Sequence, residues 1–265
     1  IGEKEILVVS FGTSYNDSRA KDIGGIESYL AKQFPDYSVR RAFTSQIIMN
    51  HILARDGEKI DNVEQALERA KKNGVKELIV QPTHLMQGKE YDELKETLDK
   101  HKADFAKVAL AEPLLGEVGK DAEEVNADKE QVATLLVQAA VTDGGFDSVQ
   151  KAGQDGAAFV FLGHGTSHTA AITYSEMQTA MRKLGYNNVF IGTVEGEPAE
   201  TAVDAVIEAV KKAGFKKVTL RPMMVVAGDH AHNDMAGAEE DSWVQKFVAS
   251  KNFDRVETQI LGLGG

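Results

Sequence analysis

Three side chains with metal-ligand chemistry follow apolar, β-branched segments in the second half of the chain. They are His164, Glu195 and His230. Two imidazoles and one carboxylate suit a borderline divalent cation and leave coordination positions open for exchange. The same groups can accept protons near neutral pH. The pattern therefore predicts a metal site on all three residues, with His164 and Glu195 also acting as catalytic groups.

Other interpretations of these residues stay open on spacing alone. His168 and His232 lie close by in the sequence and could be the ligands instead. The Gly-His-Gly run at 163–165 could form a tight strand-to-helix turn that binds an anion through backbone N–H groups. A histidine near a strand end is also more often a hydrogen-bonded structural group than a ligand.

The elements that must position these residues alternate along nearly the whole chain. Short β-branched runs and helical stretches follow one another, which is typical of parallel sheets with helices on both faces. We therefore expect an α/β fold with two similar, helix-flanked parallel-sheet halves around a central cleft. The expected strands are 5–10, 38–43, 77–82, 107–110, 157–162, 188–193, 217–222 and 255–260; the expected helices are 18–33, 45–55, 62–72, 89–100, 173–184, 198–213 and 241–250.

The two halves repeat one pattern. The segment 71–82, KKNGVKELIVQP, matches 211–222, KKAGFKKVTLRP, and FGTS at 11–14 matches HGTS at 164–167. Two matched segments in the same order favour duplication. An acidic stretch with one helix near 129–140 separates the copies. The domains expected are an N-terminal half at 1–120, a linker or insertion at 121–155 and a C-terminal half at 156–265 that carries the metal site.

Ligands in open α/β sheets bind outside the carboxyl ends of the strands, so the three candidates could line one crevice. Their counterparts in the first copy have different chemistry. Phe11 stands opposite His164, Glu90 opposite His230, and Ser45 opposite Glu195. Imidazoles at these strand ends therefore distinguish the second copy, and backbone architecture alone does not require them.

Composition excludes several classes of function. The 265 residues include 30 basic and 41 acidic side chains, a net charge of −11, and no basic stripe, so we expect no nucleic-acid partner. Apolar runs are only as long as strands, so no membrane span is expected. No Walker-type glycine loop is present, so we expect no nucleotide cofactor. We expect a cytoplasmic protein; because the chain starts at Ile1 rather than Met, export is the alternative.

Four segments carry a family resemblance: VVSFGTS at 8–14, RAFTS at 41–45, GHGTSH at 163–168 and VVAGDHAHNDM at 225–235. With these segments the chain resembles the anaerobic sirohydrochlorin cobaltochelatases, class II chelatases with a ferrochelatase-type fold of two similar α/β halves. The resemblance extends from residue 6 to 265 except for 112–154, which is longer than expected.

The resemblance implies that the enzyme inserts a divalent metal into sirohydrochlorin or a related tetrapyrrole in cobalamin biosynthesis. It implies that His164, Glu195 and His230 bind the metal and that the macrocycle lies between the two halves. Cobalt is the expected substrate metal, and relatives insert iron or nickel. The residues expected to contact the macrocycle are Phe11, Thr13, Ser14, His84 and Met86.

Arg41 is expected to anchor the acidic side chains of the macrocycle, because an octacarboxylate entering a protein of charge −11 needs local positive charge. Homo-oligomerisation is a further expectation. The rival function is a carrier that binds a metal or metallotetrapyrrole without turnover. A metal-dependent hydrolase using His164 and Glu195 is a third reading, but it lacks a nucleophile motif.

Overall fold

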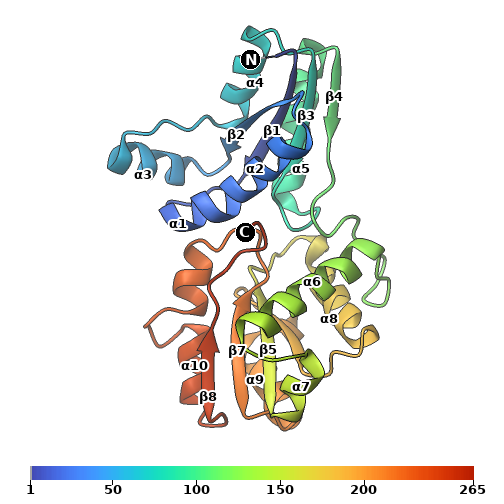
Figure 1. Cartoon of the computed structure of the whole chain (residues 1–265), viewed down its shortest axis with the longest axis vertical. Helices are drawn as coiled ribbons and strands as arrows, with labels where there is room; N and C mark the ends of the chain where they lie inside the picture. Colours follow the sequence, from blue (N-terminus) through green and yellow to red (C-terminus); the bar gives the residue numbers. More distant parts are fainter. Residues whose placement is uncertain (1) are drawn as a thin grey trace. The chain divides into compact units, whose positions relative to one another are not determined.

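The computed structural model describes residues 2–265 and divides the chain into two units (Figure 1). The N-terminal unit extends through Leu114 and includes Gly264 and Gly265, whereas the C-terminal unit is Leu115–Leu263. Each unit contains one four-stranded parallel sheet with flanking helices. The expected α/β fold with two similar halves is confirmed.

The sheet of the N-terminal unit has the strand order β2-β1-β3-β4, and every neighbouring pair is parallel. The central strand β1 is almost fully buried, as its continuous apolar sequence predicts. The four strands of this sheet are β1 (Lys4–Ser10), β2 (Ser38–Phe43), β3 (Glu77–Pro82) and β4 (Lys107–Leu110).

Helices cover both faces of this sheet. One face packs against α4 and α5, where Leu67 and Leu98 meet Leu7 of β1 in a common core. The α2 helix crosses the opposite face (Figure 1). The helices are α1 (Asn16–Ser18), α2 (Gly24–Gln33), α3 (Gln46–Asp56), α4 (Val63–Lys72) and α5 (Lys89–His101), and a π-helical turn (Arg19–Ile23) joins α1 to α2.

The C-terminal unit repeats the arrangement with the order β6-β5-β7-β8, again all parallel. The residues of β5 are buried throughout its length. Its strands are β5 (Ala157–Gly163), β6 (Val189–Thr193), β7 (Lys217–Pro222) and β8 (Arg255–Thr258).

The core of the C-terminal unit forms where α9 and α10 pack on β5, with Val210 and Phe247 against Val160. Trp243 of α10 lies over the backbone of Gly192, where a side chain would collide with the indole. The helices are α6 (Ala127–Asp143), α7 (Val149–Gln154), α8 (Ile172–Lys183), α9 (Val203–Lys212) and α10 (Trp243–Ala249).

Strand register supports the duplication. Lys4 pairs with Glu77 at the start of the β1–β3 ladder, and Ala157 pairs with Lys217 at the start of the β5–β7 ladder. The repeated segments therefore occupy equivalent positions in their sheets. Phe11 and His164 both follow directly after a central strand, as their alignment predicts.

Several elements differ from the sequence expectation. The helix expected at 18–33 is interrupted by the π-helical turn, and α7 was not predicted. The segment 121–155 contains α6 and α7, and α6 packs against α8 of the C-terminal unit. In residues 2–265, no helix is both long and apolar enough to cross a membrane.

Candidate metal centre

A sharp turn after β5 presents His164. Gly165 adopts a φ of +89°, a conformation that side chains disfavour. A Cβ atom at this position would lie 3.0 Å from the Cβ of Glu195. The Gly165 N–H donates to the hydroxyl of Tyr174 at 3.0 Å. Burial raises the pKa of Tyr174 to about 12, so this hydroxyl stays protonated and fixes the turn.

Strand pairing brings Glu195 to His164. Just beyond the last residue pair of the β5–β6 ladder, Val194 N–H donates to Gly163 O and Glu195 N–H donates to His164 O. The two side chains thereby meet at the same edge, with His164 Nε2 3.7 Å from Glu195 Oε1. Both side chains are 44% exposed, so a ligand has access to them.

His230 approaches from the third strand end. It begins a π-helical turn, His230–Met235, where the sequence predicted a loop. Its ring centroid lies 4.2 Å from that of His164, with an angle of 67° between the ring planes. The structure therefore places His164 beside both Glu195 and His230 at the carboxyl edge of the second sheet.

The alternative histidines have different surroundings. His168 uses Nδ1 to accept the Ala170 N–H at 2.9 Å, which caps the helical turn that precedes α8. This is a structural role of the kind that the sequence left open. His232 is partly buried two residues beyond His230 in the π-helical turn.

A second acidic group adjoins His230. The ligand atoms of Asp229, His230 and Asp234 all lie within 4.8 Å of one another, and His230 Nδ1 contacts Asp234 Oδ2 at 2.6 Å. Sequence reasoning included Asp234 in the motif at 225–235 but gave it no role. Asp234 lies four residues after His230, a spacing that brings two side chains together on a helical turn. The sequence predicted a loop here, so this contact was missed.

The predicted macrocycle contacts lie in the N-terminal unit and differ in exposure. The side chain of Phe11 is 48% exposed, whereas Thr13 and Met86 are buried. Ser14 is partly buried in the same loop after β1. Phe11 also lines a cavity of about 300 Å³ together with Glu90.

His84 is buried in the loop after β3. Burial lowers the pKa of its imidazole to about 4, so the ring is neutral at physiological pH. Its Nε2 lies 3.5 Å from the Glu90 carboxylate. His84 is therefore a neutral polar group at the carboxyl edge of the first sheet.

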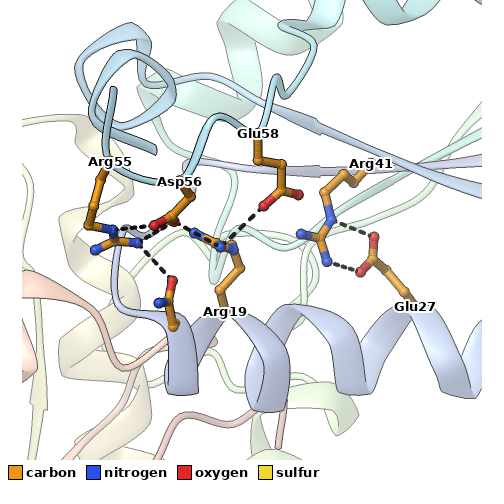
Figure 2. A network of polar contacts seen from close by, with 7 residues as sticks. Arg19, Glu27, Arg41, Arg55, Asp56 and Glu58 are labelled. Atoms are coloured by element: carbon orange, nitrogen blue, oxygen red, sulfur yellow. Dashed lines mark hydrogen bonds and ion pairs between the residues drawn. The ribbon is translucent and has the colours of Figure 1, made fainter. Parts of the chain in front are cut away.

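Arg41 lies within β2, and Figure 2 shows it facing Glu27 of α2. Arg41 donates from Nε to Glu27 at 2.9 Å and from Nη2 to the other carboxylate oxygen. In the same network Arg19 contacts Asp56 at 3.6 Å and Glu58 at 3.3 Å. The predicted anchor therefore has a carboxylate partner within the protein, which the sequence did not reveal.

Two α/β units with parallel sheets, and a histidine-carboxylate cluster at the strand ends of one unit, define the class: a two-unit α/β protein with a candidate metal site. Comparison with known proteins then specifies the family. The family described as cobalt chelatase (CbiK) matches residues 4–265. The chain belongs to this family and is a metal chelatase.

Curated relatives agree with this assignment. A sirohydrochlorin cobaltochelatase of Salmonella typhimurium is 35% identical over 251 residues, which cover 94% of this chain and 86% of the relative. A sirohydrochlorin cobaltochelatase, CbiKC, of Nitratidesulfovibrio vulgaris is 30% identical over 248 residues, covering 94% of this chain and 80% of that protein.

Proposed function

We propose that this protein inserts Co²⁺ into sirohydrochlorin in cobalamin biosynthesis and that His164, Glu195 and His230 hold the incoming metal. The position of His164 beside both Glu195 and His230 at one sheet edge carries the proposal. Membership of the cobalt chelatase family indicates cobalt as the substrate metal. The names of the curated relatives indicate sirohydrochlorin as the tetrapyrrole substrate.

The geometry suits a site that binds a metal and then releases it. All three side chains are more than two-fifths exposed, so the ion can be approached by a second set of ligands. Three protein ligands leave coordination positions free, and pyrrole nitrogens can take these positions before the protein ligands dissociate.

Insertion also requires two pyrrole protons to leave the macrocycle. His164 Nε2 and Glu195 Oε1 lie 3.7 Å apart, so two proton-accepting groups stand at the same place in the site. We propose that this pair accepts the pyrrole protons while His230 retains the metal. A puckered macrocycle exposes its nitrogens, and a site that favours this shape lowers the barrier to insertion.

The six predicted macrocycle residues of the N-terminal unit form the second part of the proposal: Phe11, Thr13, Ser14, Arg41, His84 and Met86. Phe11 offers an exposed aromatic surface to a flat ring. The guanidinium of Arg41 can pair with a substrate carboxylate if this carboxylate replaces that of Glu27.

The test is anaerobic insertion of cobalt into sirohydrochlorin, followed by absorbance, with wild type and His164→Ala. His51→Ala is the control, because His51 is exposed on α3. We expect many turnovers by wild type and the control, and a rate near the uncatalysed background for His164→Ala. Full activity of His164→Ala would place the chemistry elsewhere, and one equivalent of retained product would instead indicate a carrier.

Parallel assays with Fe²⁺ and Ni²⁺ test the metal preference. We propose that cobalt gives the highest kcat/KM. A cytoplasmic location and homo-oligomerisation are further proposals, to be tested by fractionation and by sedimentation.

A further inference from the structure

Both imidazoles of the proposed metal centre are held through Nδ1. His164 Nδ1 lies 2.8 Å from the Gly165 carbonyl oxygen, and His230 Nδ1 lies 2.6 Å from a carboxylate oxygen of Asp234. Carbonyl and carboxylate oxygens only accept hydrogen bonds, so Nδ1 is the donor in both rings. Each neutral ring therefore has its lone pair on Nε2.

The two hydrogen bonds have different origins. The partner of His164 is a backbone oxygen that no side-chain substitution removes. The partner of His230 is a separate side chain, placed by the π-helical turn that begins at His230. Asp234 is thus a replaceable side chain that contacts the Nδ1 atom of His230.

The neighbouring aspartate has another partner. Asp229 accepts a hydrogen bond from the side-chain amide of Asn233 at 2.6 Å. The two aspartates therefore have different hydrogen-bond partners: Asp229 contacts Asn233, and Asp234 contacts His230.

We propose that Asp234 is a positioning residue for cobalt: it fixes the Nδ1–H tautomer of His230 and orients Nε2 toward the metal. This inference rests on the proposed metal site. A carboxylate behind a metal-binding imidazole holds both its tautomer and its ring orientation, and loss of such a partner typically weakens metal binding about 10- to 100-fold.

The experiment measures Co²⁺ binding to the full chain without tetrapyrrole, by calorimetry and by the visible spectrum of the bound ion. Asp234→Ala is expected to weaken binding about 10- to 100-fold. Asp234→Asn keeps an acceptor oxygen but loses the charge, so its Kd should lie between those of wild type and Asp234→Ala. The KM for cobalt should rise in the same order, with the KM for sirohydrochlorin unchanged.

Glu240→Gln is the matched control, because it removes one negative charge from an exposed side chain beyond the π-helical turn. Its Kd for cobalt should equal that of wild type. Thermal unfolding of each variant identifies any general loss of structure, and the near-isosteric Asp234→Asn keeps the test informative if Asp234→Ala fails to fold.

Three results would overturn the inference. Cobalt affinities within twofold of wild type in both Asp234 variants would exclude a positioning role. Equal losses in both variants, with a spectrum showing one ligand fewer, would make Asp234 a direct ligand. Unchanged cobalt binding by His230→Ala would remove the proposed metal site itself, and the positioning role with it.

Discussion

Nε2 of His164 lies 3.7 Å from Oε1 of Glu195, just beyond the last residue pair of the β5–β6 ladder. The backbone hydrogen bond from Glu195 to the His164 carbonyl fixes the two residues opposite each other. The main chain thus keeps the two residues next to each other when either side chain is replaced. This makes the pair a suitable place to separate metal binding from proton transfer.

Replacement of Glu195 by glutamine tests its role as a proton acceptor. The amide keeps the size of the side chain but cannot accept a proton, so we expect kcat for cobalt insertion to fall about 100-fold or more. The measurement is steady-state insertion under saturating cobalt. Glu208→Gln, on the exposed surface of α9, should keep wild-type kcat. An unchanged kcat for Glu195→Gln would assign proton transfer to another group.

The Gly165 turn should tolerate no side chain. Gly165→Ala forces alanine into φ +89° and brings its Cβ to 3.0 Å from Glu195, so we expect a loss of about 1–3 kcal/mol in unfolding free energy and weaker cobalt binding. Urea unfolding and cobalt titration measure the two effects.

The control for Gly165→Ala is Gly185→Ala. Gly185 has φ +81° and no neighbouring atoms within 4 Å of an added Cβ, so it isolates backbone strain from displacement of the site. We expect it to lose stability with cobalt affinity retained. Equal cobalt affinities for the two variants would show that the Gly165 turn does not position the ligands.

Arg41 tests the recognition of substrate carboxylates. Arg41→Ala removes a charge-assisted hydrogen bond worth about 1.5–3 kcal/mol, so the KM for sirohydrochlorin should rise about 10-fold or more, with cobalt affinity unchanged. Glu27→Gln frees the guanidinium from its partner in Figure 2 and should not raise this KM. Arg255→Ala, on the exposed strand β8, is the control. A KM unaffected by Arg41→Ala would give the Arg41–Glu27 pair a purely structural role.

His84 should make stability depend on pH. Burial lowers its pKa from 6.5 to about 4, so the unfolded chain binds the proton more readily than the folded chain. The resulting stabilisation is present above pH 6.5 and is lost as the pH falls toward 4, a change of about 3 kcal/mol. The measurement is the unfolding free energy of wild type and of His84→Gln at pH 7 and at pH 4. The free energy of wild type minus that of His84→Gln should be lower at pH 4 than at pH 7 by that amount. A pH-independent difference would contradict this assignment.

Strand ends were predictable from the sequence because apolar runs and the internal repeat identify them. Once β5 and β6 are neighbours in a parallel sheet, His164 and Glu195 must emerge at the same edge. The order of the strands alone therefore predicts that these two residues are close, without knowledge of the side-chain conformations.

Contacts that depend on local helix type or on distant side chains were not predictable. Asp234 reaches His230 through a π-helical turn, and such turns have no clear signature in periodicity. Glu27 lies on α2 and Arg41 on β2, and many other helices and strands also carry charged residues. The sequence pattern therefore gave no reason to pair these two residues.

The most direct test follows cobalt itself from the three ligands into the product. Wild-type protein is loaded with one equivalent of radiolabelled Co²⁺ and then mixed anaerobically with sirohydrochlorin and an excess of a chelator that removes free metal. We predict labelled cobalt-sirohydrochlorin in nearly one equivalent, and none when His230→Ala is treated in the same way. Complete capture of the label by the chelator, with no labelled product from wild type, would contradict the claim that the His164–Glu195–His230 site lies on the path of metal insertion.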